Sequence, residues 1–118
     1  MNIQESAEMY LETIYILSLK QDNVRSIDIA KERSFSKPSV SRAVNNLKND
    51  NYIDIDVNGY ISLTDKGLAL AKKIYERHTV LTKYFIKLGV SDKTAEDDAC
   101  KIEHVISDET FEIIKKQL

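Results

Sequence analysis

The chain has 118 residues, with 17 basic and 19 acidic side chains, a net charge of −2 and one cysteine. This length suits one domain or two small units, a lone cysteine excludes an internal disulfide, and the net charge excludes a uniformly cationic nucleic-acid coat. The sequence has no apolar run of about 18 residues and an acidic, amphipathic N-terminus in place of a signal peptide, so we expect a cytoplasmic protein without membrane contact.

The first half of the chain is predicted to be helical. Apolar side chains recur at three-to-four spacing over residues 5–20, which is typical of an amphipathic helix. A shorter helix is predicted over 26–34 with Ser26 as its N-cap, and a turn follows over 34–40. Pro38 suits the first turn of a third helix. The apolar positions of this third helix are Val40, Ala43, Val44 and Leu47.

A change of period follows the third helix. Apolar and acidic side chains alternate over residues 53–57, Asn58-Gly59 comes next, and apolar residues resume at Tyr60. An Asn-Gly pair between two such runs predicts a β-hairpin. Two helices joined by a tight turn and followed by a hairpin form a winged helix-turn-helix, which we assign to residues 1–70.

The remaining chain, residues 71–118, is predicted to be helical as well. A long helix begins with Thr64 or Asp65 as its cap and ends at Gly89. Two further helices begin at Ser91 and Ser107. The expected fold class is therefore mainly α, with the winged helix-turn-helix followed by a helical region.

The third helix carries the features of a DNA-reading element. The window from Lys31 to Lys48 has five basic residues and one acidic residue, a local charge of +4. Recognition helices contact double-stranded DNA through side chains near their N-terminus, and here Arg42 can reach guanine or a phosphate. The candidate DNA-binding residues are Ser36, Lys37, Pro38, Ser39, Ser41, Arg42 and Lys48. Asp54 and Asp56 make the wing a poor phosphate contact.

A purely structural role of these residues, without DNA binding, is the alternative interpretation. The serines can be simple helix caps, and the basic window can be the solvated face of an ordinary helix-hairpin core.

A second constellation lies near the C-terminus. Cys100, Glu103 and His104 have the i, i+3, i+4 spacing of one helical face. Thiolate, carboxylate and imidazole together suit a divalent ion such as Fe(II), Co(II), Ni(II) or Zn(II), and further ligands would be needed. The alternative is a small buried thiol beside two surface polar groups.

Two segments that frame the winged helix carry a family resemblance. "EMYLETIYIL" and "DDACKIEHVISDE" resemble the signature segments of the diphtheria toxin repressor (DtxR/MntR) family, and the resemblance runs from about residue 6 to 118. It implies a metal-activated bacterial repressor that lacks the family's C-terminal SH3-like domain, with dimerisation and metal binding in residues 71–118. It places the primary metal site on Met9, Cys100, Glu103 and His104. Metal then ties the first helix to the dimerisation helices and favours the DNA-binding arrangement.

The resemblance leaves a second metal site open. Iron-type members would use His78, Thr82 and Glu96, although position 82 is a glutamate in that pattern. Manganese-type members would use Glu12 and His78, although they have an aspartate at position 9 and a glutamate at position 100. We expect an iron-like primary site and a hybrid second site on Glu12 and His78. The alternatives are a solvated Glu12 and a surface histidine at a subunit seam.

Methionine and cysteine ligands favour Fe(II), because Mn(II) prefers oxygen, while Mn(II), Co(II), Ni(II) and Zn(II) are possible. Surplus apolar residues in the last helices predict a homodimer on a palindromic operator, with a monomer core as the alternative. The leading hypothesis is a metal-dependent repressor of metal homeostasis genes. The runner-up is a winged-helix regulator that responds to oxidation of Cys100. No nucleophile-base pair or phosphate loop supports an enzyme or a small-molecule substrate.

Overall fold

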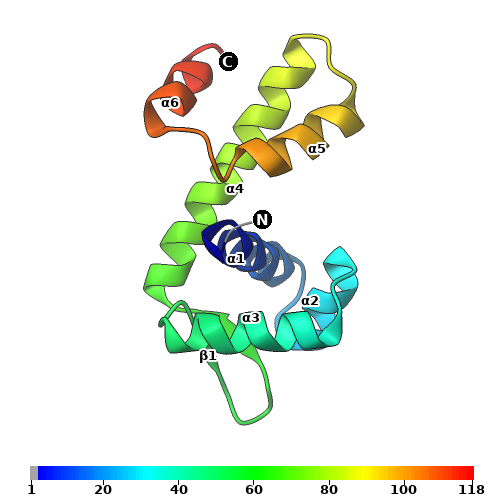
Figure 1. Ribbon diagram of the computed structural model, residues 1–118, viewed down its shortest axis with the longest axis vertical. Coiled ribbons are helices and arrows are strands. Elements are labelled where there is room, and N and C mark those ends of the chain that lie inside the picture. The colour runs from blue at the N-terminus through cyan, green and yellow to red at the C-terminus, as the bar shows by residue number, and fades with distance from the viewer. Residues whose placement is uncertain (1–2) are drawn as a thin grey trace. The chain divides into compact units, whose positions relative to one another are not determined.

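The computed structural model describes residues 3–118, so the first two residues of the expected 1–70 domain lie outside it. The chain divides into two compact units, which we call unit 1, Met1–Lys72, and unit 2, Lys73–Leu118. Over the residues described, six helices and two strands follow one another in the order expected for a winged helix-turn-helix and a helical region (Figure 1). The mainly α fold class is thereby confirmed.

Unit 1 contains the winged helix-turn-helix. Its helices are α1 (Ile3–Lys20), α2 (Ser26–Arg33), α3 (Lys37–Asn49) and the first turns of α4 (Asp65–Lys87), and its strands are β1 (Ile53–Ile55) and β2 (Ile61–Leu63). One apolar core joins these elements. Its buried members are Tyr10, Leu11, Ile14, Leu17, Val24, Ile29, Ala30, Val40, Val44, Leu47, Ile53, Ile61 and Ala71.

The turn between α2 and α3 is locked onto this core. Ser34 ends α2 in the left-handed region at φ 57°. The ring of Phe35 then packs on Tyr10 with centroids 4.7 Å apart. Ser36 caps α3 by accepting a hydrogen bond from the Ser39 N–H at 3.2 Å, and Pro38 occupies the first turn as predicted. These contacts set the direction in which α3 leaves the turn.

The N-cap of α2 corrects the sequence prediction. Arg25, rather than Ser26, has the extended backbone of a cap at φ −120° and ψ 166°. Its N–H donates to the carboxylate of Asp28 at 2.8 Å, which is the return half of a capping box. An acidic side chain three residues into the helix therefore decided the start of α2.

The hairpin is shorter than the alternation over 53–57 predicted. Its antiparallel register pairs Ile53 with Leu63 and Ile55 with Ile61, and β1 ends at Ile55. The reason is Asp56, whose carboxylate accepts the N–H groups of Asn58 and Tyr60, both at 2.9 Å, and folds the chain into its loop.

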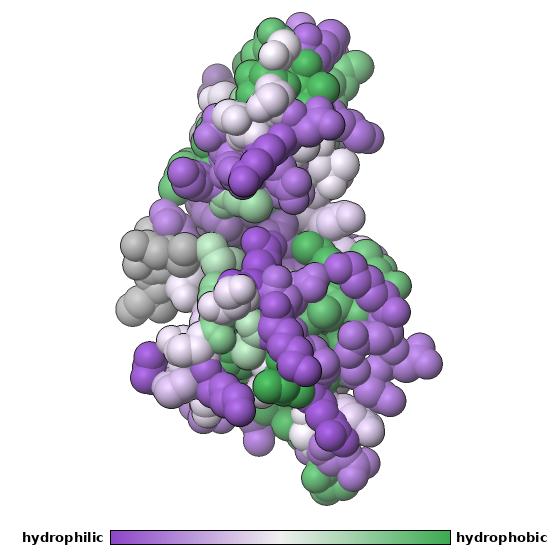
Figure 2. All heavy atoms as spheres, turned by 90° about the vertical axis from the view of Figure 1, so that its right-hand side faces the viewer, coloured by the Kyte–Doolittle hydropathy of each residue, from purple (hydrophilic) through white to green (hydrophobic). Residues whose placement is uncertain are grey.

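The predicted Asn-Gly turn lies within that loop. Gly59 supplies the left-handed conformation at φ 79°, and its N–H donates to the Asp56 carbonyl at 3.0 Å. Val57 is left fully exposed in this loop. The loop lies at the lower end of Figure 1, and hydrophobic atoms are visible at the same end of Figure 2.

Unit 2 contains the rest of α4 together with α5 (Asp92–Ile102) and α6 (Asp108–Lys116). Thr64 caps the start of α4 by accepting the Gly67 N–H at 3.1 Å. Gly89, at φ 106°, terminates α4: its N–H donates to Ile86, and the following N–H donates to Phe85. This is the Schellman pattern of a glycine stop. Among residues 3–118, no helix is long and apolar enough to cross a lipid bilayer.

Gly67 packs directly against the main chain before β1, and this contact gives a prediction. A Cβ at Gly67 would lie 2.0 Å from the carbonyl oxygen of Tyr52. Gly67→Ala should therefore lower the free energy of unfolding by about 3 kcal/mol, measured by urea denaturation.

Gly59→Ala is the matched control. That position is open to solvent and strained only by its positive φ, so its cost should be about 1 kcal/mol. Equal losses for the two variants would contradict the steric interpretation of Gly67.

Candidate metal centre and nucleic-acid interface

The outer face of α3 presents the residues that the sequence singled out for DNA. Val40, Val44 and Leu47 are buried in the core of unit 1, which turns the opposite face outward. The candidates on that side are exposed except for the half-buried Ser39: Ser36, Lys37, Pro38, Ser41, Arg42 and Lys48.

Two of the serine hydroxyls are occupied locally. Ser36 accepts the N–H of Ser39 and donates its own hydroxyl to Ser39 Oγ at 2.8 Å. Arg42 Nη2 lies 3.5 Å from the same Ser39 oxygen. Ser36 therefore serves as a cap. Ser41 and Arg42 are exposed on the next turn, where a side chain can reach the edge of a base.

The ion pairs of unit 1 determine which basic side chains of this surface remain available to contact DNA. Arg33 Nη2 lies 3.4 Å from Glu12 Oε1, so this guanidinium is directed inward. Lys20 pairs with Glu32 at 2.8 Å and offsets the one acid of the basic window. The exposed cations left to the α2–α3 surface are Lys31, Lys37, Arg42 and Lys48.

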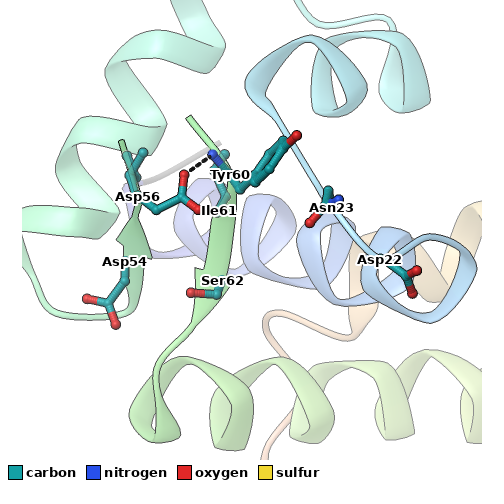
Figure 3. A pocket seen from close by; sticks show the side chains of 8 residues that line it. Asp22, Asn23, Asp54, Asp56, Tyr60, Ile61 and Ser62 are labelled. Atoms are coloured by element: carbon teal, nitrogen blue, oxygen red, sulfur yellow. Dashed lines mark hydrogen bonds between the residues drawn. The ribbon is translucent and has the colours of Figure 1, made fainter. Parts of the chain in front are cut away.

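The face beside the wing has the opposite charge. A hollow of about 330 Å³ is lined there by residues of the α1–α2 connection and the hairpin: Asp22, Asn23, Asp54, Ile55, Asp56, Tyr60, Ile61 and Ser62 (Figure 3). Three carboxylates disfavour a phosphate backbone. The candidate contacts with DNA are therefore those of α3, and the wing contributes little electrostatic attraction.

In unit 2, ligand-type side chains lie close together at the end of α5. The helix ends at Ile102, so Glu103 is its C-cap and His104 lies in the following turn. Glu103 still has right-handed helical backbone, and its N–H donates to the Ala99 carbonyl at 2.9 Å. The side chain of His78 approaches these residues from α4.

The cluster has short internal distances. His78 Nδ1 lies 2.8 Å from Glu103 Oε2 and 3.7 Å from Cys100 Sγ, and His104 Nε2 lies 3.3 Å from Glu103 Oε1. Glu103 is completely buried and the His104 side chain is 3% exposed, while Cys100 is half-buried. The alternative of a buried thiol beside two surface polar groups is therefore wrong.

This environment changes the acidity of His78. The Cys100 thiol and the Glu103 carboxylate beside its ring raise the pKa of His78 to about 10, against the opposing effect of burial. A metal ion would displace that proton, since imidazole binds metal in its neutral form.

The donors of unit 2 fit a transition-metal ion. Glu103 Oε1 is buried and has no hydrogen-bond donor in the part of the chain that the structure describes. A buried carboxylate oxygen without a donor is unusual and is suited to a cation. Imidazole, thiolate and carboxylate are together the ligands of a borderline divalent ion.

The other predicted ligands stand in different surroundings. Met9 and Glu12 belong to α1 of unit 1, and Glu12 is buried rather than solvated as the alternative interpretation had it. Thr82 donates its hydroxyl to the His78 carbonyl at 2.7 Å, and Glu96 is exposed on α5. A second site that uses these residues stays a prediction.

Sequence inspection missed Arg77, the neighbour of His78. Arg77 is 7% exposed, and its guanidinium donates to main-chain carbonyls at Glu103 and Ile106. An arginine in a predicted helix is usually assigned to the solvent-exposed surface. The only sequence signal for Arg77 was its position next to His78, a candidate ligand.

Comparison with known families assigns a chain that has both this helix-turn-helix and this donor cluster to a family. The family model for the iron dependent repressor N-terminal DNA binding domain matches residues 2–60. The model for the iron dependent repressor metal binding and dimerisation domain matches residues 64–118. The chain belongs to the diphtheria toxin repressor (DtxR/MntR) family. Members of this family are metal-dependent transcriptional repressors.

Relatives within the DtxR/MntR family support this membership over nearly the whole chain. An uncharacterised HTH-type transcriptional regulator of Methanocaldococcus jannaschii is 34% identical, covering 96% of this chain and 92% of its own. The HTH-type transcriptional regulator MntR of Lysinibacillus sphaericus is 32% identical, covering 86% and 73%. The solved structure of the manganese regulator SloR superimposes with a TM-score of 0.84 at 29% identity, over 98% of this chain. The chain spans only 54% of that structure's length.

The pKa of His78 predicts how the metal-free protein responds to pH. A histidine whose pKa is about 10 when folded and about 6.5 when unfolded stabilises the fold fully below pH 6.5, and this contribution is lost as the pH rises through 10. His78→Gln should therefore cost about 2 kcal/mol of unfolding free energy at pH 6 and much less at pH 10.5. Urea unfolding in the presence of a chelator measures both. A difference that does not change with pH would contradict the charged His78–Glu103 pair.

Proposed function

We propose that this chain is a cytoplasmic, Fe(II)-dependent repressor of metal homeostasis genes that binds a palindromic operator as a homodimer. One observation carries the proposal. His78, Cys100, Glu103 and His104 form a largely buried donor cluster within the segment that matches the family's metal binding and dimerisation domain.

The proposed ligands divide by donor type. Glu103 and His104 supply a carboxylate and an imidazole, and Cys100 supplies a soft sulfur donor that favours Fe(II) over Mn(II). We also propose Met9 and Glu12 of α1 as ligands, because a thioether and a carboxylate extend the same donor set. When bound, the ion would supply a set of coordinate bonds that stabilise one conformation over others. Metal binding and operator binding would then be linked equilibria.

The proposed DNA contact is made by α3. Arg42 would read a base, while Lys37 and Lys48 would contact phosphates and set the register. Their exposure on the side opposite to the core, and the acidic hollow beside the wing, support this assignment.

The proposed homodimer rests on the surface of unit 2. Large apolar side chains are exposed there, and hydrophobic atoms gather at the upper end of Figure 2. The exposed large apolar residues of unit 2 are Ile86, Leu88, Val105, Ile113 and Leu118. A two-fold dimer would cover such residues and present two copies of α3 to a palindrome.

A manganese-responsive regulator is the second candidate. It is favoured by the similarity to the manganese regulator SloR and by the close imidazole–carboxylate pair of His78 and Glu103. In that case Glu12 and His78 would be the central ligands, and Cys100 would stay outside the coordination shell.

Metal-stimulated DNA binding tests the proposal directly. Operator fragments are first selected from random double-stranded DNA with the reduced protein under anaerobic conditions with Fe(II). Wild-type protein should then bind the selected DNA only when metal is present. Glu103→Gln should lose this stimulation, because an amide is a poor ligand for the ion. Fluorescence anisotropy of labelled DNA measures the affinities.

Arg42→Ala is the matched control on the other unit. It should keep metal affinity and lose about 10- to 100-fold in operator affinity. Metal-independent binding by wild-type protein, or full stimulation of Glu103→Gln, would refute the metal-dependent mechanism.

The absorption spectrum of the Co(II) complex distinguishes the two candidate ions. If Cys100 is a ligand, titration of the reduced apoprotein with Co(II) should produce a near-ultraviolet thiolate-to-metal charge-transfer band that Cys100→Ser lacks. Binding without that band would favour the manganese-type arrangement on Glu12 and His78.

A further inference from the structure

Arg77 is the one strongly buried cation of unit 2 whose place in the proposed function is unassigned. It follows Glu76 on α4 and directly precedes His78. Its guanidinium Nη1 donates to the carbonyl of Glu103 at 3.2 Å and to the carbonyl of Ile106 at 2.9 Å. Nη2 donates to the carboxylate of Asp108, the first residue of α6. A single side chain therefore spans the connection from the end of α5 to the start of α6.

One of these acceptors, the Glu103 carbonyl, belongs to the C-cap of α5. The last carbonyls of α5 have no partner further along the helix, and they carry the negative end of its dipole. A guanidinium spreads five donors over three nitrogens in a rigid plane, so it spans acceptors that lie apart, whereas an ammonium has three donors on a single nitrogen. The ring of Phe111, with its centroid 5.6 Å from the guanidinium carbon, adds a cation–π contact to these hydrogen bonds.

Glu103 is consequently held twice from α4. Its main-chain carbonyl is held by Arg77, and its carboxylate is held by His78 at 2.8 Å. Residues 77 and 78 are adjacent, so the two contacts fix both the position of the Glu103 backbone and the direction of its side chain. The turn that leads into His104 is fixed by the same bonds.

Burial of the Arg77 guanidinium is energetically unfavourable. Its Nε is buried without an acceptor among residues 3–118, and removing a charged group from water costs free energy that such an unpaired donor does not recover. Groups behind the ligands that orient a metal site typically change metal affinity 10- to 100-fold when removed.

We infer that Arg77 is a positioning residue of the metal centre, which holds the turn after α5 so that Glu103 and His104 present their side chains to the ion. This inference rests on the proposed function. It differs from a purely structural role, because the arginine determines ligand geometry and not only the docking of α6.

Anaerobic Co(II) titration of wild-type protein and Arg77→Lys tests the inference. Lysine keeps the charge but has one nitrogen in place of the two guanidinium nitrogens that contact the two carbonyls and the carboxylate. We expect Arg77→Lys to retain its helical circular dichroism, to bind Co(II) about 10- to 100-fold more weakly, and to show a shifted ligand-field spectrum. Unchanged affinity and spectrum, even with a lower unfolding midpoint, would overturn the inference in favour of a structural arginine.

Lys73→Gln is the matched control. Lys73 pairs with the same Asp108 at 3.6 Å, but its side chain is 54% exposed and, within unit 2, it forms no hydrogen bond or ion pair with Glu103. Its Co(II) affinity should stay within about threefold of wild type, well below the effect of a lost orienting group. A loss as large as that of Arg77→Lys would show that charge, and not positioning, is responsible.

Asp108→Asn keeps the inference falsifiable if Arg77→Lys does not fold. This change removes the ion pair with the guanidinium but leaves its contacts with the two carbonyls. We therefore expect a smaller loss of Co(II) affinity than in Arg77→Lys. No loss of affinity would overturn the inference. Wild-type protein that fails to bind Co(II) would instead overturn the proposed function itself.

Discussion

A carboxylate that is removed from water loses its hydration, so its charge has to be balanced by donors or cations within reach. Glu103 is completely buried: its Oε2 lies 2.8 Å from His78, its Oε1 lies 3.3 Å from His104 without a hydrogen bond, and its main-chain carbonyl accepts from Arg77. Two of these partners are consecutive on α4. Burial of one acid therefore determines which face of α4 meets the end of α5, and it concentrates imidazole, thiol and carboxylate donors in one small volume.

Unit 1 is organised by apolar packing instead. The core of α1, α2, α3 and the hairpin holds α3 through Val40, Val44 and Leu47, and the stacking of Phe35 on Tyr10 fixes the turn that precedes it. Polar side chains on the outer face are then presented by a rigid helix at no cost to the core. The side chains of the candidate DNA-binding surface are thus positioned by apolar packing in unit 1, and those of the donor cluster are positioned by hydrogen bonds and ion pairs in unit 2.

The sequence was informative where one local rule acted alone. The helical periods, Pro38, the Thr64 cap and the Gly89 stop all depend on residues close in the chain, and the structure confirms them. It was less informative where two local rules competed, as at Asp56, whose carboxylate ended β1 before the apolar alternation did. Burial of Glu103 and the role of Arg77 depend on contacts 26 residues apart, which spacing cannot reveal. Residue types and spacing pointed to Cys100, Glu103 and His104, but they could not show that His78 lies beside Glu103 and Cys100.

Cys100 is the only cysteine of the 118 residues, and it lies half-buried against His78 in the donor cluster. A thiol-reactive dye can therefore attach to this chain at one place, without any engineered site. The rate of that labelling reports how accessible the sulfur is, and hence whether the cluster is open or engaged. The protein carries, in its native sequence, a chemical probe of its own candidate site.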